Sequence, residues 1–179
     1  STDWMSADLH VHAVNSPDSD VPNTERALSF AAEGVDVLVS TDHDYITDFG
    51  PVVRDLGAEN AMATMIGCEL TPFDYGHQQA FPLVRNPADT RGGAFDWAGG
   101  AGPSLRLDQL YAGVRAQHPN VVLQLNHPRG SGGSLTQLKV DTATGATHAL
   151  AETFRMEPAP GATSTDTRLL SNDFDAIEV

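Results

Sequence analysis

The chain has 179 residues, of which 40% are hydrophobic, and it contains no apolar run near the about 18 residues that indicate a membrane-spanning helix. Its 24 acidic and 10 basic residues give a formal net charge of −14. Such a surface repels phosphate backbones and anionic lipids, so we expect a single domain over residues 1–179 that binds neither nucleic acid nor membranes.

Short apolar runs alternate with amphipathic segments, which is the pattern of α/β folds. The expected elements are a strand at 5–12, a helix at 23–34, a strand at 35–40, a short helix at 49–57, strands at 61–70 and 79–84, a helix at 106–119, and strands at 120–125 and 174–179. The first helix has an apolar stripe at Leu28, Ala31 and Ala32 and should end at Gly34. The glycine-rich segment 86–104 predicts an irregular loop.

The segment "SADLHVHAVNSPDSD" raises the first question about function. Asp8, His10 and His12 occupy alternate positions, with apolar residues between them. Because successive side chains of a strand point to opposite faces, one face would carry a carboxylate and two imidazoles. That combination is unusual for a buried strand and typical of a metal site.

Later apolar strands also end in polar side chains or are closely followed by them. These side chains are His43 in "TDHD", Glu69 in "GCE", His77 in "GH", and His127 and Arg129 in "NHPRG". In α/β folds the carboxyl ends of strands lie together, so we expect these groups to converge. Imidazole binds zinc, manganese and iron, and a carboxylate can bridge two ions. The sequence therefore predicts a site for two divalent metal ions, with Glu69 as the bridge.

Each residue also has a structural interpretation when it is taken alone. His10 and His12 could be hydrogen-bonded core residues, His43 a turn residue, and Glu69 a salt-bridged strand end. Arg129 could bind an anionic substrate group or pair with a carboxylate. The clustering of so many metal-ligand types at strand ends favours the metal site over these separate explanations.

As a set, "DLHVH", "STDHD", "GCE", "GH" and "NHPR" occur in an order, over residues 8–130, that resembles the PHP (polymerase and histidinol phosphatase) metallohydrolases. The wording "GHQQAFPL" is most similar to the carbaryl-hydrolase-type branch, which includes enzymes that hydrolyse carbamate esters. The resemblance implies an α/β fold, namely a distorted (β/α)7 barrel with up to three metal ions at its mouth.

The resemblance also implies seven metal ligands, which are His10, His12, Asp18, His43, Glu69, His77 and His127. The first ion would be held by His10, His12 and Glu69, the second by Glu69, His77 and His127, and the third by His43 with Asp18. Asp8 and Asp42 would orient the imidazoles.

One feature departs from the family pattern. The family closes its site with a late Asp-x-His motif beyond a strand that resembles "DAIEV", whereas this chain ends at Val179. The resemblance then implies a barrel truncated before its last strand or strands, in which the first and third ions each lack a ligand. We expect the site formed by Glu69, His77 and His127 to be the best occupied.

These observations predict a metal-dependent hydrolase that uses a metal-activated hydroxide to cleave a phosphoester or a carbamate or carboxylic ester of a small molecule. His43 or a neighbouring acid would assist the leaving group, and Arg129 would bind the substrate. The alternative is a catalytically incomplete PHP domain that acts as a metal-binding structural or interaction module. The sequence leaves the metal (zinc, manganese or iron), the compartment and the oligomeric state open.

Overall fold

A computed structural model describes residues 4–72, 75–98, 105–146 and 171–179. The chain forms two compact units. The first comprises the residues up to Glu69 together with Ala80–Ala94, and the second comprises Leu70–Gln79 and the chain from Phe95 onward. Within the described ranges, no helix is long and apolar enough to cross a membrane.

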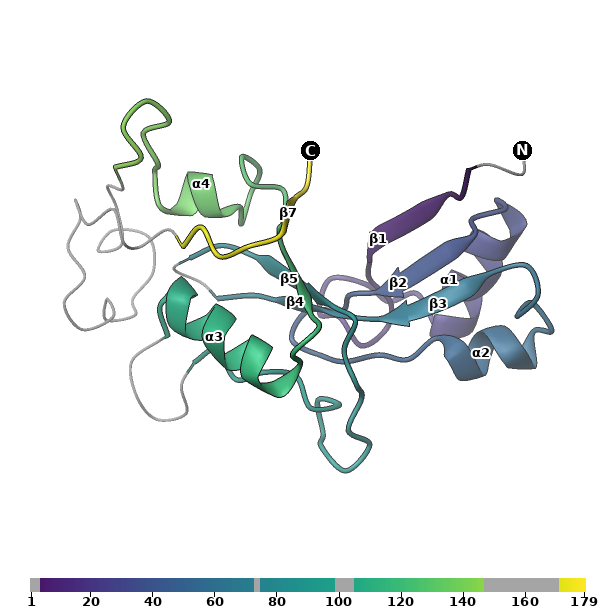
Figure 1. Ribbon diagram of the computed structural model, residues 1–179. Coiled ribbons are helices and arrows are strands. Elements are labelled where there is room, and N and C mark those ends of the chain that lie inside the picture. Colours follow the sequence, from purple (N-terminus) through teal and green to yellow (C-terminus); the bar gives the residue numbers. More distant parts are fainter. Residues whose placement is uncertain (1–3, 73–74, 99–104, 147–170) are drawn as a thin grey trace. The chain divides into compact units, whose positions relative to one another are not determined.

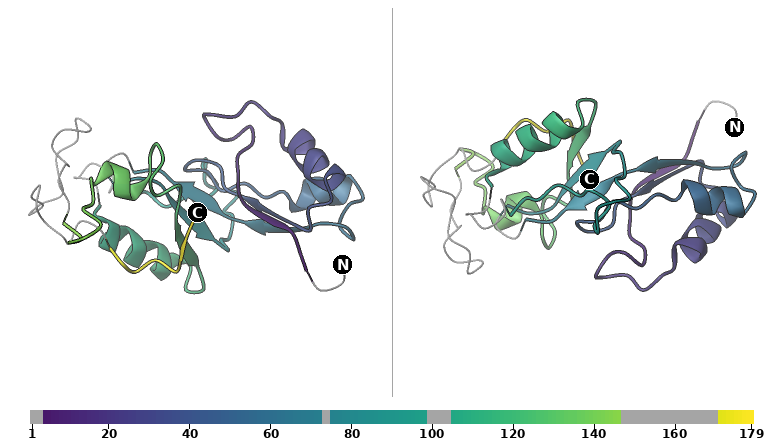
Figure 2. Two further views of the ribbon diagram at one scale, coloured as in Figure 1. Left: turned by 90° about the horizontal axis from the view of Figure 1, so that it is seen from above. Right: turned by 90° about the horizontal axis from the view of Figure 1, so that it is seen from below.

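The first unit contains a three-stranded parallel sheet with the order β1-β2-β3. Its elements are β1 (Ala7–Val11), α1 (Asn23–Ala32), β2 (Val37–Ser40), α2 (Gly50–Asp55) and β3 (Ala63–Ile66). Figures 1 and 2 show α1 and α2 side by side on one face of this sheet. The predicted stop of α1 is confirmed, since Gly34 follows the helix with a φ of 73° that favours glycine.

The core of the first unit lies between this sheet and its two helices. It is built from Val11, Ala13, Ala27, Leu38, Phe49, Val53 and Met62. Of the apolar stripe predicted for α1, Ala31 is confirmed, since it packs against this core. Leu28, which is 55% exposed, and Ala32 do not, and Ala27 and Phe30 take their place. The apolar residues that alternate with His10 on β1 differ in exposure. Val11 is buried, whereas Leu9 is exposed.

The register of β1 against β2 is irregular where the candidate ligands lie. Asp8 pairs with Leu38 and Val11 pairs with Ser40, so two residues of β1 oppose Val39 alone. A bulge of this kind bends a strand and redirects its side chains, and such bulges are frequent beside functional sites. His10 is one of the two residues in the bulge.

The other sheet has the order β4-β5-β6-β7, and β6 pairs in parallel with β7. The remaining elements are β4 (Cys68–Leu70), β5 (Gln78–Phe81), α3 (Leu107–Gln117), β6 (Val122–Leu125), α4 (Ser134–Gln137) and β7 (Ala176–Ile177). The apolar face predicted for the helix at 106–119 is confirmed, since Leu107, Leu110, Tyr111 and Val114 are all buried. The described part of the predicted loop, residues 86–98, has neither helix nor strand.

The expected (β/α)7 barrel is wrong. The described strands form one small sheet of three strands and one of four, without a closed barrel, whereas barrel closure requires every strand to pair on both sides. The strand expected at 61–70 is split at Gly67, so that β3 and β4 belong to different sheets. A Cβ atom at this glycine would lie 2.9 Å from the carbonyl oxygens of Ser40 and Ala80. The close approach of these backbones explains why glycine stands here.

Cys68, the single cysteine, is buried at the start of β4. Desolvation by burial raises the pKa of its thiol well above the ordinary value, and the nearby carboxylate of Asp44 adds to this effect. The residue therefore packs as a small apolar side chain rather than acting as a thiolate.

A matched pair of leucine substitutions tests this core. Leu38→Ala removes a fully buried side chain, and we expect it to lower the free energy of unfolding by roughly 2–5 kcal/mol. Leu28→Ala removes an exposed leucine from α1 and should change it by about 0.5 kcal/mol or less. Urea unfolding followed by circular dichroism measures both. Equal losses in the two variants would show that the core has been placed wrongly.

Candidate metal site

The backbone joins the ends of β1 and β2 through Thr41. The Thr41 amide donates to the Val11 carbonyl at 2.9 Å, and the Val11 amide donates to the Thr41 hydroxyl at 2.6 Å. His12 follows Val11 directly in the chain, and His43 lies two residues after Thr41. The two histidines therefore leave the sheet at the same edge.

Glu69 is fixed beside His43 by an isolated parallel bridge between the two residues. The Glu69 amide donates to the Asp42 carbonyl at 3.2 Å, and the Asp44 amide donates to the Glu69 carbonyl at 2.9 Å. Asp44 has a positive φ of 51°, which is uncommon for a residue with a side chain and typical of functional loops.

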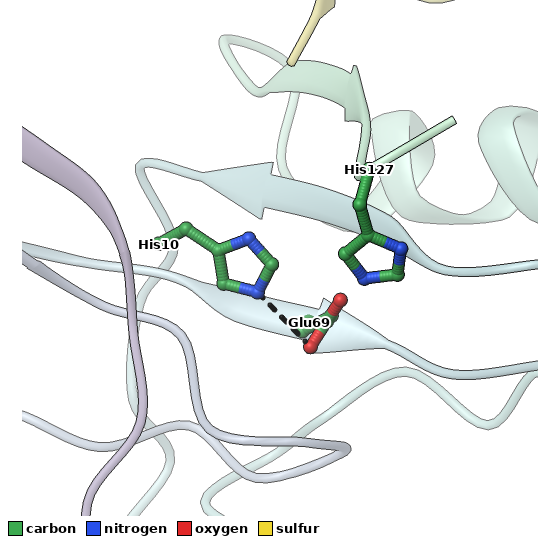
Figure 3. A group of neighbouring side chains, drawn as sticks. All are labelled: His10, Glu69 and His127. Atoms are coloured by element: carbon green, nitrogen blue, oxygen red, sulfur yellow. Dashed lines mark ion pairs between the residues drawn. The ribbon is translucent and has the colours of Figure 1, made fainter. Parts of the chain in front are cut away.

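Three imidazoles converge on one oxygen of Glu69. The distances to Glu69 Oε2 are 3.3 Å from His10 Nε2, 3.2 Å from His12 Nε2 and 3.1 Å from His43 Nδ1. Figure 3 draws His10 and Glu69 with the ion pair between them marked. The Glu69 side chain is 0% exposed, and the three histidine side chains are 13–19% exposed. All four residues belong to the first unit.

The hydroxyl of Ser16 determines which nitrogen of His12 carries a proton. It donates its single hydrogen to Asp18 Oδ1 at 2.7 Å, so it can only accept from the His43 amide at 3.2 Å and from His12 Nδ1 at 2.9 Å. Neutral His12 therefore has its proton on Nδ1 and a lone pair on Nε2. That lone pair points toward the Glu69 carboxylate and is 3.0 Å from His10 Nε2. Such an arrangement requires a cation or a proton between these atoms.

The donor set fits a transition metal. Tetrahedral zinc, with bonds of roughly 2.0–2.1 Å to nitrogen and oxygen, places its ligand atoms about 3.3 Å apart. The separations among His10, His12 and Glu69 are 3.0–3.3 Å. Ligand atoms of His12, His43 and Glu69 also lie within 4.8 Å of one another. These buried histidine and glutamate side chains could hold a metal ion.

Asp18 lies at the outer side of this group. Its carboxylate is 3.4 Å from His43 Nε2 and 3.7 Å from His12 Nδ1. Burial raises the pKa of Asp18, but the hydrogen bond from Ser16 and the charges of the two histidines outweigh it, so that the pKa is lowered overall. Asp18 is therefore ionised at neutral pH and supplies a second carboxylate beside the imidazoles.

The roles expected for Asp8 and Asp42 need correction. The Asp42 carboxylate accepts hydrogen bonds from the Ala13 amide and the Thr47 hydroxyl, and the Asp8 carboxylate accepts one from the His10 amide. Within the part of the chain that the structure describes, neither carboxylate bonds to an imidazole ring. Both act on the backbone that positions the histidines.

His77, His127 and Arg129 belong to the second unit. The His77 and His127 rings lie edge to face with their centroids 5.1 Å apart. Arg129 is exposed and lines a cavity of about 460 Å³ together with His127 and Glu178. The ion expected among Glu69, His77 and His127 would use residues of both units, and it stays a prediction.

Ser16 is the residue that sequence reasoning missed. It is 4% exposed and contacts His12, Asp18 and His43, yet it carries no metal-ligand side chain. The available signal was a small hydroxyl residue between two predicted ligands in "HAVNSPD". Serine is common in such turns, so the segment alone does not distinguish this role.

Comparison with known proteins finds no family model and no curated protein that matches this chain. The expected membership of the PHP family therefore stays a prediction. The case for the site rests on the geometry of its own residues.

Replacing Ser16 by alanine tests the hydrogen-bond arrangement. Ser16→Ala removes the acceptor of His12 Nδ1 and of the His43 amide, so we expect zinc binding to weaken roughly 10- to 100-fold. Ser29→Ala, at an exposed serine of α1, should leave it unchanged. Competition with a chromophoric chelator gives the dissociation constants. Equal affinity in Ser16→Ala and the native chain would contradict the assigned tautomer.

Proposed function

We propose that this chain is a metal-dependent hydrolase that cleaves a small phosphoester or a carbamate or carboxylic ester. One observation carries the proposal, namely the three imidazole nitrogens within 3.3 Å of the buried oxygen Glu69 Oε2. A buried carboxylate surrounded by imidazoles is costly unless positive charge compensates it. A divalent cation supplies that charge and leaves a reactive centre near solvent.

We propose that two or three divalent ions, zinc, manganese or iron, bind here. A cation in such a site would polarise the electrophilic oxygen of an ester and would lower the pKa of bound water to about 7. Nitrogen and oxygen ligands of this kind accept all three metals. Glu69 would be the ligand shared between ions, because its carboxylate has two oxygens and lies within 3.3 Å of all three imidazoles.

His43 is assigned the proton transfer to the leaving group. Its Nδ1 faces Glu69 at 3.1 Å, and its Nε2 faces Asp18 at 3.4 Å. The Asp18 carboxylate would accept the proton of His43 Nε2 and so orient the ring for proton transfer. The Asp18 side chain is 53% exposed, which places this end of His43 near solvent.

A metal and activity measurement on paired histidine variants tests the proposal. After zinc or manganese loading and dialysis, the native chain should retain at least one equivalent of metal and hydrolyse one member of a panel. The panel consists of p-nitrophenyl phosphate, a phosphodiester, p-nitrophenyl acetate and an aryl carbamate. His12→Ala should lose most of the metal and lower kcat/KM by about 100-fold or more.

His118→Ala is the matched control, because His118 is the C-cap residue of α3 and lies in the second unit. It should retain the metal and the activity of the native chain. Metal retention without hydrolysis of any panel member would favour the alternative, a structural or interaction module. Failure of the native chain to retain metal would reject both.

A further inference from the structure

We propose that Arg26 is a substrate-binding residue, whose guanidinium group binds an anionic oxygen group of the substrate beside the candidate metal ligands. This inference rests on the proposed hydrolase function and specifies the class of substrate. That class is an ester that carries a phosphoryl or carboxylate group. Arg26 lies in the first turn of α1 and belongs to the first unit, as do the metal-ligand candidates beside it.

A cavity of about 370 Å³ joins Arg26 to the candidate metal site. The candidate ligands His10, His12 and Asp18 line it, and so do Ser19 and Arg26. Two of the histidines that converge on Glu69, His10 and His12, therefore line the same cavity as Arg26. Ligand-binding sites are concave regions of this size with a few converging polar groups.

The guanidinium of Arg26 has few partners within the protein. Its Nη2 donates to the Ser19 hydroxyl at 3.4 Å, and its Nε is buried without a hydrogen-bond partner among the described residues. Other arginines pair with acids, as Arg106 does with Asp108 at 2.6 Å and Arg115 does with Asp175 at 3.1 Å. A guanidinium has five N–H donors, and a buried donor without a partner is costly. Arg26 therefore has capacity for an external acceptor.

The acidic residues that line the cavity do not serve as hydrogen-bond acceptors for the Arg26 guanidinium. Asp18 accepts the Ser16 hydroxyl and faces His12 and His43, while the Asp8 carboxylate accepts the His10 amide. Among the described residues, neither carboxylate lies within ion-pair distance of Arg26. The chain has 24 acidic residues, yet none within the described ranges forms an ion pair with this arginine, which favours an external anion.

The chemistry of the guanidinium group defines what it binds. Its planar fork matches two oxygens of a phosphoryl or carboxylate group and binds them more strongly than neutral acceptors. Such contacts would hold the charged part of a substrate while the ester linkage lies toward His12. A neutral ester would gain nothing from Arg26, which separates the two substrate classes experimentally.

Kinetics on matched esters test this assignment. For Arg26→Gln we expect the KM of an anionic ester to rise roughly 10- to 100-fold with kcat little changed. The KM of neutral p-nitrophenyl acetate should not change. p-Nitrophenyl phosphate and p-nitrophenyl hydrogen succinate separate the phosphoryl from the carboxylate source. Arg26→Lys retains the positive charge but lacks the planar guanidinium, so its KM for the anionic esters should lie between those of the native chain and Arg26→Gln. Arg54→Gln, at an exposed arginine of α2, is the control and should match the native chain.

Equilibrium binding gives a readout that needs no turnover. Calorimetric titration of the metal-free and zinc-loaded chain with inorganic phosphate and with succinate should show at least about tenfold weaker binding in Arg26→Gln. If the native chain hydrolyses nothing, the proposed function fails while this titration still decides the role of Arg26. Native KM values and native oxyanion affinity in Arg26→Gln would overturn this inference alone, as would the absence of oxyanion binding by the native chain.

Discussion

The buried carboxylate of Glu69 is the constraint on which the site depends. An ionised carboxylate removed from water costs several kcal/mol unless its surroundings compensate for it. In this protein the compensation comes from His10, His12 and His43, which reach one oxygen of Glu69 from two chain segments. Since imidazoles are neutral for much of the physiological range, full compensation requires a cation or protons in the same place. A chain with a net charge of −14 also attracts cations.

Short polar contacts, rather than long regular elements, hold these groups in position. Thr41 joins the ends of β1 and β2, and the bridge between His43 and Glu69 sets the carboxylate beside the second of these strands. Ser16 then determines the orientation of the His12 ring and contacts Asp18. The site is therefore held by hydrogen bonds to backbone and hydroxyl groups. We expect removal of one of these hydroxyl groups to weaken metal binding more than it lowers the stability of the core.

Local patterns predicted which of the polar residues lie close together better than they predicted the architecture. His10 and His12 alternate with apolar residues, and a strand has a period of two, so the sequence predicts that both side chains lie on one face. His43 follows an apolar run, which predicts its position at the end of a strand. Barrel closure depends on which strands pair, and strand pairing cannot be predicted from a local sequence pattern. The apolar run around Gly67 reads as one strand, yet the backbones packed against this glycine divide it into β3 and β4. Ser16 was missed because serine is common in turns and because its contact with the His43 amide comes from a residue distant in sequence.

The most direct measurement is a crystal structure of the chain loaded with zinc or manganese, with anomalous diffraction recorded at the absorption edge of the metal. Our account predicts an anomalous peak within roughly 2.0–2.2 Å of His12 Nε2 and of a Glu69 oxygen. A loaded crystal with no peak at Glu69, and with His10, His12 and His43 each hydrogen-bonded to separate partners, would contradict it.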